Sequence, residues 1–190
     1  YLLTIHAFNL AEHYRCPVFI ASNKEIAMTR ESVDLDGLTL PTIVERKAAP
    51  ADHSGHPFAP LEGDLVPPFL PMGGSRLSRQ TSSTHGPEGY ITTDPAVIDK
   101  GIVRLMEKLH GAIDDFSFFD LDAEPDYTTL LIVYGVTARA ARTAVKRLRK
   151  MGEKVSLLIL KTLYPVPKTI IQRSISGKTH VAMVEMNHGQ

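Results

Sequence analysis

The sequence has very little cysteine, no excess of charge of either sign and no long hydrophobic run. Cys16 is the only cysteine among 190 residues, so this chain alone cannot build a disulfide framework, an iron–sulfur cluster or a cysteine-based zinc site. Basic and acidic residues number 21 each, which gives no indication of binding to nucleic acid or to a membrane. No apolar run approaches the ~18 residues that a membrane-spanning helix needs. We therefore expect a protein of a reducing compartment, the cytoplasm.

Motifs that identify common enzyme classes are also missing. The chain contains neither the GxxxxGK(S/T) loop of phosphate-binding enzymes nor the GxSxG elbow of α/β hydrolases. The most suggestive serines are Ser75 and the cluster from Ser82 to His85, and both lie in polar loops. Serine-rich loops are mostly inert, so a hydrolase is rejected.

Possible metal ligands are few. His53 and His56 share one loop, and His85 and Cys16 are the only residues that we consider as completions. Two histidines in a loop rich in proline and glycine are more often exposed than ligating, and no second paired ligand motif accompanies them. No resident metal is predicted for this chain.

The last third of the chain carries the clearest pattern. Short apolar runs of strand length alternate there with amphipathic helical patterns. The predicted strands are 129–134, 155–160 and 181–184, and the predicted helices follow Thr137 and cover 168–175. Strands that alternate with helices predict an α/β fold with a mostly parallel sheet, right-handed crossovers and helices on both faces.

The first of these helices has clear boundary signals. Gly135 is predicted to end the preceding strand, and Thr137 is predicted to cap the helix. Gly152 is predicted to stop it. Apolar residues recur at the spacing of one buried face. They are Ala141, Ala144, Val145, Leu148 and Met151.

The rest of the chain divides into two regions that precede this domain. Residues 1–33 contain a predicted helix at 4–14 and a predicted buried strand at 17–21, the remnant of a second α/β domain. Residues 34–94 form a connector with nine of the 13 prolines, counting Pro95 at its edge, which excludes a helix or a central strand there. Because the chain opens and closes inside α/β patterns, we expect it to be part of a longer subunit.

A further helix leads from the connector into the C-terminal domain, which we place at residues 95–190. Asp94 and Pro95 are typical helix-start residues and predict a helix from Ala96 to about His110. Its apolar residues recur at helical spacing and predict a buried face. They are Ile98, Ile102, Leu105, Met106 and Leu109.

Two segments are candidates for ligand binding. The turn from Gly135 to Thr137 can present backbone N–H groups at a helix N-terminus, where the dipole favours an anion. Every strand-to-helix turn shares these features, so a phosphate site and a plain structural turn are both open. The loop Thr81–Tyr90 gathers hydroxyls, two glycines that allow close approach of a ligand, and His85, whose ring can donate a hydrogen bond. A ligand contact and a tight structural crossing are equally consistent with it.

A basic run follows on the helix after Thr137. Its cations either form a solvated helix face near the helix C-terminus, where the dipole favours them, or dock a phosphate-bearing ligand or an acidic partner. They are Lys146, Arg147, Arg149 and Lys150.

Six stretches in order resemble the α subunit of the 2-oxoacid:ferredoxin oxidoreductases, especially the 2-oxoglutarate type. Each motif is weak alone, but the resemblance runs along nearly the whole chain. The stretches are Ala7–Val18 (AFNLAEHYRCPV), Ser22–Glu31, the loop with Thr84, His85, Gly89 and Asp94-Pro95, Tyr134–Val145, Lys161–Pro167 (KTLYPVP) and Val184–Gln190 (VEMNHGQ).

This resemblance implies an architecture and an activity. Residues 1–33 would be the end of a thiamine-diphosphate pyrimidine-type domain, and the region after about residue 125 a transketolase C-terminal-like domain. The assembled enzyme would oxidatively decarboxylate a 2-oxoacid to an acyl-CoA and pass electrons through iron–sulfur clusters to ferredoxin. Thiamine diphosphate, Mg²⁺ and the clusters would belong mainly to partner subunits or to other domains, with coenzyme A as co-substrate. A β subunit, and possible further small subunits, would complete an enzyme of which this part alone is inactive.

The resemblance also gives candidate site residues. Arg30 and the loop of Thr84, His85 and Gly86 would line the region near the active-site cleft. Gly135, Thr137 and Arg139 would bind a phosphate of coenzyme A or contact a subunit, because a guanidinium suits bidentate phosphate recognition. The departures from the family pattern are Asn23, Met28-Thr29 and Pro87-Glu88.

Two alternatives stay open. The C-terminal domain can be a non-catalytic assembly or regulatory module that binds a partner subunit through an apolar face and the connector. A transketolase-like or dehydrogenase-type enzyme with the same C-terminal domain also fits the fold, but it does not account for Ala7–Val18 or the loop at His85.

Overall fold

The computed structural model describes residues 1–53, 55–74, 76, 78–81 and 83–187, and it divides into two compact units. The first unit consists of Tyr1–Ile20 with Asp34–Ala112, and the second of Ala21–Val33 with Ile113–Gln190. The helix predicted at 95–110 therefore clusters with the connector. The domain boundaries predicted from the sequence stay a prediction.

The second unit is built around a four-stranded sheet with the order β1-β3-β2-β4. β2 pairs in parallel with both β3 and β4, whereas β1 pairs antiparallel with β3 at one edge. The strands are β1 (Phe119–Asp122), β2 (Thr129–Tyr134), β3 (Val155–Leu160) and β4 (His180–Val184). The predicted mostly parallel α/β fold is confirmed, and the antiparallel strand β1 is an addition to it.

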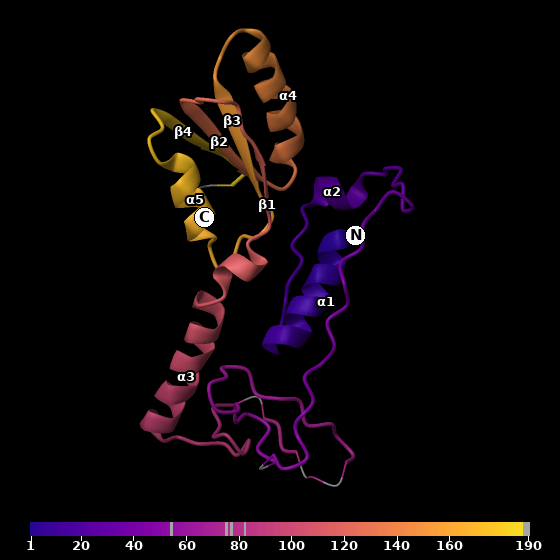
Figure 1. Cartoon of the computed structure of the whole chain (residues 1–190), viewed down its shortest axis with the longest axis vertical. Helices are drawn as coiled ribbons and strands as arrows, with labels where there is room; N and C mark the ends of the chain where they lie inside the picture. Colours follow the sequence, from indigo (N-terminus) through magenta and orange to yellow (C-terminus); the bar gives the residue numbers. More distant parts are fainter. Residues whose placement is uncertain (54, 75, 77, 82, 188–190) are drawn as a thin grey trace. The chain divides into compact units, whose positions relative to one another are not determined.

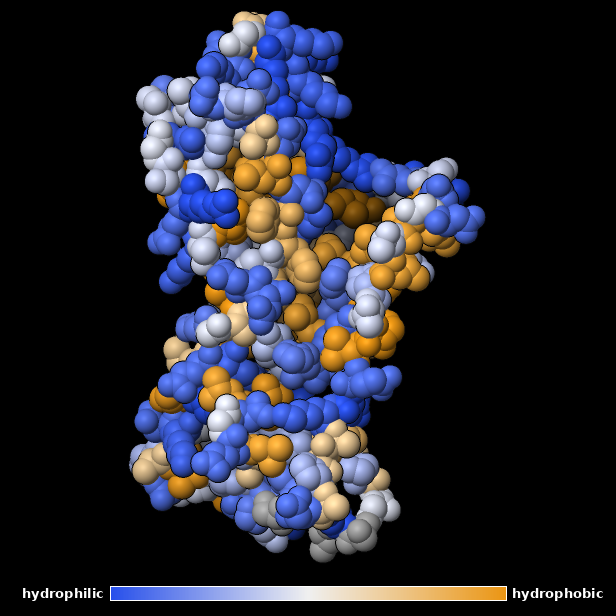
Figure 2. All heavy atoms as spheres, viewed as in Figure 1, coloured by the Kyte–Doolittle hydropathy of each residue, from blue (hydrophilic) through white to orange (hydrophobic). Residues whose placement is uncertain are grey.

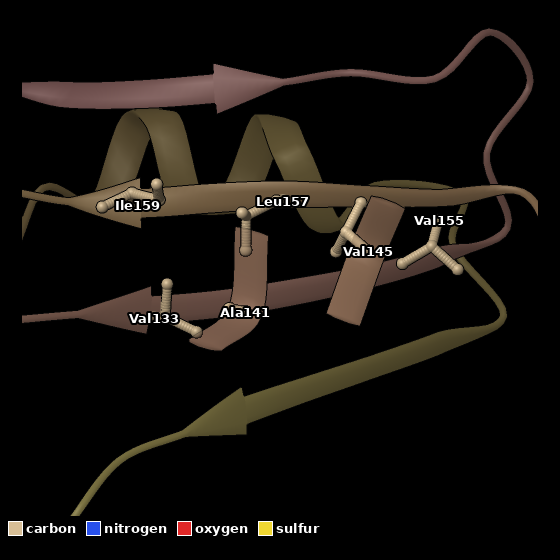
Figure 3. Close-up of a cluster of buried hydrophobic side chains, with 6 residues drawn as sticks. All are labelled: Val133, Ala141, Val145, Val155, Leu157 and Ile159. Carbon is tan, nitrogen blue, oxygen red and sulfur yellow. The ribbon is translucent and has the colours of Figure 1, made fainter. Parts of the chain in front are cut away.

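Helices α4 (Thr137–Lys150) and α5 (Lys168–Ile175) cover opposite faces of this sheet (Figure 1). Every residue of β3 is buried, as expected for a central strand with both faces covered. Figure 3 shows the cluster on the α4 side, and Ile170 of α5 packs on the other side against a second cluster. The α4 cluster consists of Val133, Ala141, Val145, Val155, Leu157 and Ile159.

Three details of α4 differ from the prediction. Thr137 is the first helical residue and not the cap, and its hydroxyl donates to the Tyr134 carbonyl at 2.6 Å. Ala144 is exposed because it lies beside the packed stripe, where Ala138 contributes instead. Met151 is exposed because it follows the last helical turn. The helix ends near Gly152 as predicted, and Gly152 adopts a left-handed φ of 89°.

Strand β4 forms the other edge of the sheet and is exposed along its whole length. Val181, Met183 and Val184 are among its exposed residues. A strand of a parallel sheet is usually buried on both faces. This apolar edge strand is therefore left uncovered by the described part of the chain.

The first unit contains α1 (Leu2–Tyr14), α3 (Pro95–His110) and the connector. Arg15, at the end of α1, adopts a left-handed φ of 47° and organises the connector. Its Nη1 donates to the carbonyls of Pro57, Pro67 and Pro68 at 3.2, 3.0 and 2.8 Å. Burial lowers the pKa of Arg15. A guanidinium with several donors thus holds together a segment that its prolines keep from forming a sheet.

The predicted strand at 17–21 is wrong. The segment lies outside every strand of the described residues, and the Phe19 side chain is 89% exposed. Its composition favours an extended backbone, but a strand also needs a neighbouring strand to hydrogen-bond with, and none pairs with it here. Figure 2 shows further hydrophobic side chains at the surface after α2 (Lys24–Met28), where Leu40 and Ile43 are exposed.

Helix α3 begins as predicted, with the Asp94 carboxylate accepting a hydrogen bond from the Ala96 N–H at 2.9 Å. Its predicted apolar face is only partly buried, because Ile102, Leu105 and Met106 are exposed. Lys108 is the buried residue of this helix, 4% exposed, and its ammonium group donates to the Tyr14 carbonyl at 2.7 Å. Burial lowers the pKa of Lys108.

Candidate functional site

Polar side chains gather at the carboxyl ends of β2 and β4. Tyr134 is the last residue of β2, and Glu185 follows β4 directly. The Tyr134 hydroxyl donates to Glu185 Oε2 at 2.9 Å and accepts from Asn187 Nδ2 at 2.6 Å. The carboxyl ends of parallel strands are where open α/β sheets bind ligands. We call this group, with the first turn of α4, the carboxyl-edge site.

Tyr134 is electrostatically coupled to Glu185. The hydrogen bond to the Glu185 carboxylate raises the pKa of Tyr134, and desolvation and the negative charge of Glu185 act in the same direction. The phenol therefore remains protonated at neutral pH and keeps donating to the carboxylate. Only one oxygen of Glu185 is engaged by Tyr134, so the other can accept an N–H or O–H group from a ligand.

The first turn of α4 forms the next part of this site. Gly135 adopts a left-handed φ of 61°, which allows the sharp turn from β2 into the helix. The side-chain amide of Asn23 lies against it, since a Cβ on Gly135 would be 3.7 Å from Asn23 Nδ2. Asn23 Oδ1 is buried and has no hydrogen-bond partner among the described residues. Asn23, one of the residues that depart from the family pattern, therefore lies at the candidate site.

Arg139, one turn further along α4, forms an ion pair with Glu31. Both side chains are about half exposed, so the pair adds little to stability. The three predicted phosphate-binding residues, Gly135, Thr137 and Arg139, thus lie together at one helix start. The Arg139 guanidinium, which was predicted to bind the phosphate, is therefore paired with the Glu31 carboxylate of the same chain.

The remaining predicted cleft residues lie in two places. Arg30 is exposed and belongs to the same unit as the sheet, whereas Thr84, His85 and Gly86 belong to the other unit. The latter three form a tight hairpin-like loop, in which His85 bridges to Ile91. The Thr84 hydroxyl donates to the Thr92 carbonyl at 2.9 Å.

The His85 ring has structural contacts of its own. It stacks on the Phe58 ring with the two centroids 3.8 Å apart, and its Nδ1 lies 3.0 Å from the Gly86 carbonyl oxygen. Gly86 is buried, and a Cβ there would lie 2.3 Å from a Glu88 carboxylate oxygen. The structure therefore gives this loop a packing role, while its place near a cleft remains a prediction.

The candidate metal ligands form no site among the described residues. His53 Nδ1 accepts a hydrogen bond from the Gly55 N–H at 3.1 Å. In the described part of the chain, no three His, Cys, Asp or Glu side chains are placed to hold a metal ion. The candidates Ser75 and Ser82 lie outside the described residues.

The basic run of α4 divides into two kinds of residue. Arg149 is a structural clamp, because its guanidinium donates to the Val155 carbonyl and to both Asp122 Oδ1 and the Asp122 carbonyl, each at 2.9 Å. It joins α4 to β3 and to the edge strand β1. Lys146, Arg147 and Lys150 are exposed, as the solvated-face interpretation predicts.

The sequence analysis missed the pairing of Tyr134 with Glu185. Each residue stands at the end of a predicted strand, and both lie within stretches quoted for the family resemblance. Parallel pairing of β2 with β4 brings their ends together. A sequence argument that had ordered the strands could have found this pair.

Comparison with known proteins shows which families this chain is similar to. Residues 128–190 match the family described as pyruvate:ferredoxin oxidoreductase core domain II. The 2-oxoglutarate synthase subunit KorA of Methanocaldococcus jannaschii is 32% identical over 194 residues, which cover 100% of this chain and 50% of that protein. The ketoisovalerate oxidoreductase subunit VorB of Methanothermobacter marburgensis is 38% identical over 188 residues, covering 99% of this chain and 46% of that protein.

The predicted resemblance is confirmed. The chain is similar along its whole length to α subunits of 2-oxoacid:ferredoxin oxidoreductases, and it spans about half the length of the curated relatives it matches. The same fold occurs in the 2-oxoglutarate:ferredoxin oxidoreductase from Magnetococcus marinus, solved with 2-oxoglutarate, coenzyme A and succinyl-CoA bound. The TM-score is 0.85 at 23% identity, covering 99% of this chain and 33% of that one.

Proposed function

We propose that this chain is part of the α subunit of a thiamine-diphosphate-dependent 2-oxoacid:ferredoxin oxidoreductase, with 2-oxoglutarate as the favoured substrate. The observation that carries the proposal is the similarity of this whole chain to half of the KorA subunits of 2-oxoglutarate synthases. The enzyme would convert the 2-oxoacid to an acyl-CoA and pass the electrons to ferredoxin. The chain described here would be inactive without its partners.

The cofactors of this reaction would be held mainly elsewhere in the assembly. Thiamine diphosphate, with its Mg²⁺, supplies the carbanion chemistry when bound, and protein groups supply orientation and electrostatics. An iron–sulfur cluster usually needs four cysteine ligands, and Cys16 alone does not fit that requirement. We therefore assign these groups to the β subunit, to further small subunits or to other domains.

The carboxyl-edge site is the part of this chain that we assign to coenzyme A. The start of α4 offers a helix N-terminus and the Arg139 guanidinium, which together suit a phosphate group. A phosphate would displace the Glu31 carboxylate from Arg139, since both are anions that compete for the same donors. Arg30 and the Thr84–Gly86 loop are proposed to lie near the cleft of the assembled enzyme.

A partner subunit is supported by the uncovered edge strand. Val181, Met183 and Val184 of β4 expose apolar surface that a partner can bury.

The exposed strand β4 also favours the second candidate function, a non-catalytic assembly module. The two are separated by Arg139→Gln: loss of subunit association supports the module, whereas a raised requirement for coenzyme A with intact assembly supports the enzyme.

A cytoplasmic location is part of the proposal, because iron–sulfur chemistry linked to ferredoxin suits a reducing compartment. None of the helices in the described residues has the length and hydrophobicity that a bilayer span requires.

The substrate is tested by assaying the purified native complex with several 2-oxoacids. We expect coenzyme A-dependent reduction of ferredoxin to be fastest with 2-oxoglutarate, compared with pyruvate and 2-oxoisovalerate. Higher kcat/KM for 2-oxoisovalerate would assign the chain to the specificity of its VorB relative instead. No activity with any 2-oxoacid in an intact, cofactor-loaded complex would contradict the proposed reaction.

A further inference from the structure

The connector contains a hollow of about 790 Å³, which is within the usual range for small-molecule sites of ~300–1,000 Å³. None of its lining residues belongs to the carboxyl-edge site or to the unit that holds it. The lining mixes polar and apolar surface and includes two arginines and a tyrosine ring. It consists of Gly55, His56, Arg76, Ser78, Arg79, Gln80, Glu88 and Tyr90.

Arg76 is fixed in this hollow by backbone acceptors. Its guanidinium donates to the carbonyls of Pro50 at 3.1 Å, Ala51 at 2.7 Å and His53 at 3.4 Å. These acceptors are neutral, and Arg76 forms no ion pair among the described residues. An arginine that is held in place but not neutralised is suited to bind an anion.

A second guanidinium is held against an aromatic ring. Arg79 lies 4.3 Å from the centroid of Tyr90, whose side chain is 57% exposed. Gly89 fixes this arrangement: a Cβ there would lie 2.2 Å from the Arg79 carbonyl oxygen, and its φ is 86°. Only glycine permits this approach of the two backbones, so the stacked pair is built into the loop.

Two further groups add hydrogen-bonding capacity. The Ser78 hydroxyl is buried and has no partner among the described residues, a state that costs free energy until a partner is supplied. Glu88 contributes the carboxylate of the lining, and carboxylates accept hydrogen bonds from sugar hydroxyls in nucleotide sites. The hollow thus combines cations for phosphate, a flat ring for stacking and an acceptor for hydroxyls.

We propose that this hollow binds a phosphorylated ligand with an aromatic base, of the nucleotide class. Arg76 and Arg79 hold the phosphate, Tyr90 stacks on the base, and Glu88 accepts from the sugar. This site goes beyond the reaction proposed above, because its lining includes none of the residues assigned to that reaction.

The test is isothermal titration calorimetry of the full chain with ADP, pyrophosphate and adenosine. We expect saturable binding of ADP, weaker binding of pyrophosphate and no measurable binding of adenosine. Arg79→Gln should weaken ADP binding about tenfold, the effect of losing one good charged contact. Tyr90→Leu should weaken ADP binding about fivefold or more through lost stacking, and leave pyrophosphate binding unchanged.

Arg173→Gln is the matched control, because Arg173 is an exposed arginine on α5 in the other unit. It should leave all three titrations unchanged. The proposal is overturned if ADP shows no saturable binding, or if Arg79→Gln and Arg173→Gln give the same affinity. Equal binding of ADP and pyrophosphate, with no effect of Tyr90→Leu, would overturn the aromatic part and leave a plain anion site.

Discussion

At the scale of single residues, the hydrogen bond between Tyr134 and Glu185 predicts a measurable titration. Because the carboxylate is the main cause of the raised pKa of Tyr134, Glu185→Gln should lower that pKa toward the ordinary value of ~10. The measurement is tyrosinate absorbance against pH, with Tyr134→Phe as the control that identifies the shifted group. An unchanged titration in Glu185→Gln would contradict the coupling.

The same pair predicts the sign of a pH effect on stability. A folded-state pKa above the unfolded one means that the contribution of Tyr134 is present below pH ~10 and is lost as the pH rises through the folded pKa. Glu185→Gln should therefore reduce the loss of stability in that alkaline window.

The ion pair of Arg139 with Glu31 predicts that substitutions of its two residues change the KM for coenzyme A in opposite directions. In the assembled enzyme, Arg139→Gln should raise the KM for coenzyme A about tenfold with little change in kcat. Glu31→Gln should lower that KM, because it removes the competing carboxylate. Arg147→Gln, an exposed arginine of the same helix, is the control and should have no effect. Equal KM values in all three variants would remove Arg139 from the site.

Two substitutions distinguish a packing role of His85 from a role in the reaction. His85→Phe keeps an aromatic ring to stack on Phe58, whereas His85→Ala removes it. If His85 transfers a proton in the cleft of the assembled enzyme, both variants should lower turnover about 100-fold or more, the range expected for loss of such a group. Full turnover in His85→Phe, with loss only in His85→Ala, would assign the residue to packing alone.

At the scale of elements, the sheet of the second unit depends on the core of β3. Leu158 is fully buried, so Leu158→Ala should lower the free energy of unfolding by ~2–5 kcal/mol. Leu163→Ala, at an exposed position after the same strand, should change it by less than ~0.5 kcal/mol. Chemical denaturation measures both, and similar small effects would contradict the packing of α5 against β3.

The elements also show what a sequence can predict. β2 and β3 have the predicted bounds because short apolar runs between turn residues are local signals. β1 was missed because Phe119–Asp122 is short and alternating, and its pairing with β3 is not local. The segment at 17–21 has a strand's composition but lacks a neighbouring strand, which composition cannot report.

In the candidate site too, residues close in sequence could be predicted together, whereas contacts made by the fold could not. Gly135, Thr137 and Arg139 could be grouped from the sequence because they are close in it, and their binding role stays a prediction. The pair of Tyr134 and Glu185 spans 51 positions and exists only because β2 and β4 are neighbours. The Glu31 partner of Arg139 was missed because it depends on where residues 21–33 fold, which their sequence pattern does not specify.

At the scale of the whole molecule, we propose that this chain works only within a larger assembly. Its similarity extends over half of its KorA relatives, its edge strand β4 is uncovered by the described residues, and its single cysteine cannot ligate a cluster alone. A subunit of such an enzyme should therefore be found with partners that carry the cofactors.

The measurement that tests this claim most directly is affinity purification of the full-length native protein from its own cells, followed by analysis of the bound cofactors. We predict recovery of a second subunit together with iron, sulfide and thiamine diphosphate. A lone polypeptide without cofactor would contradict the oxidoreductase and leave an α/β scaffold that acts by binding.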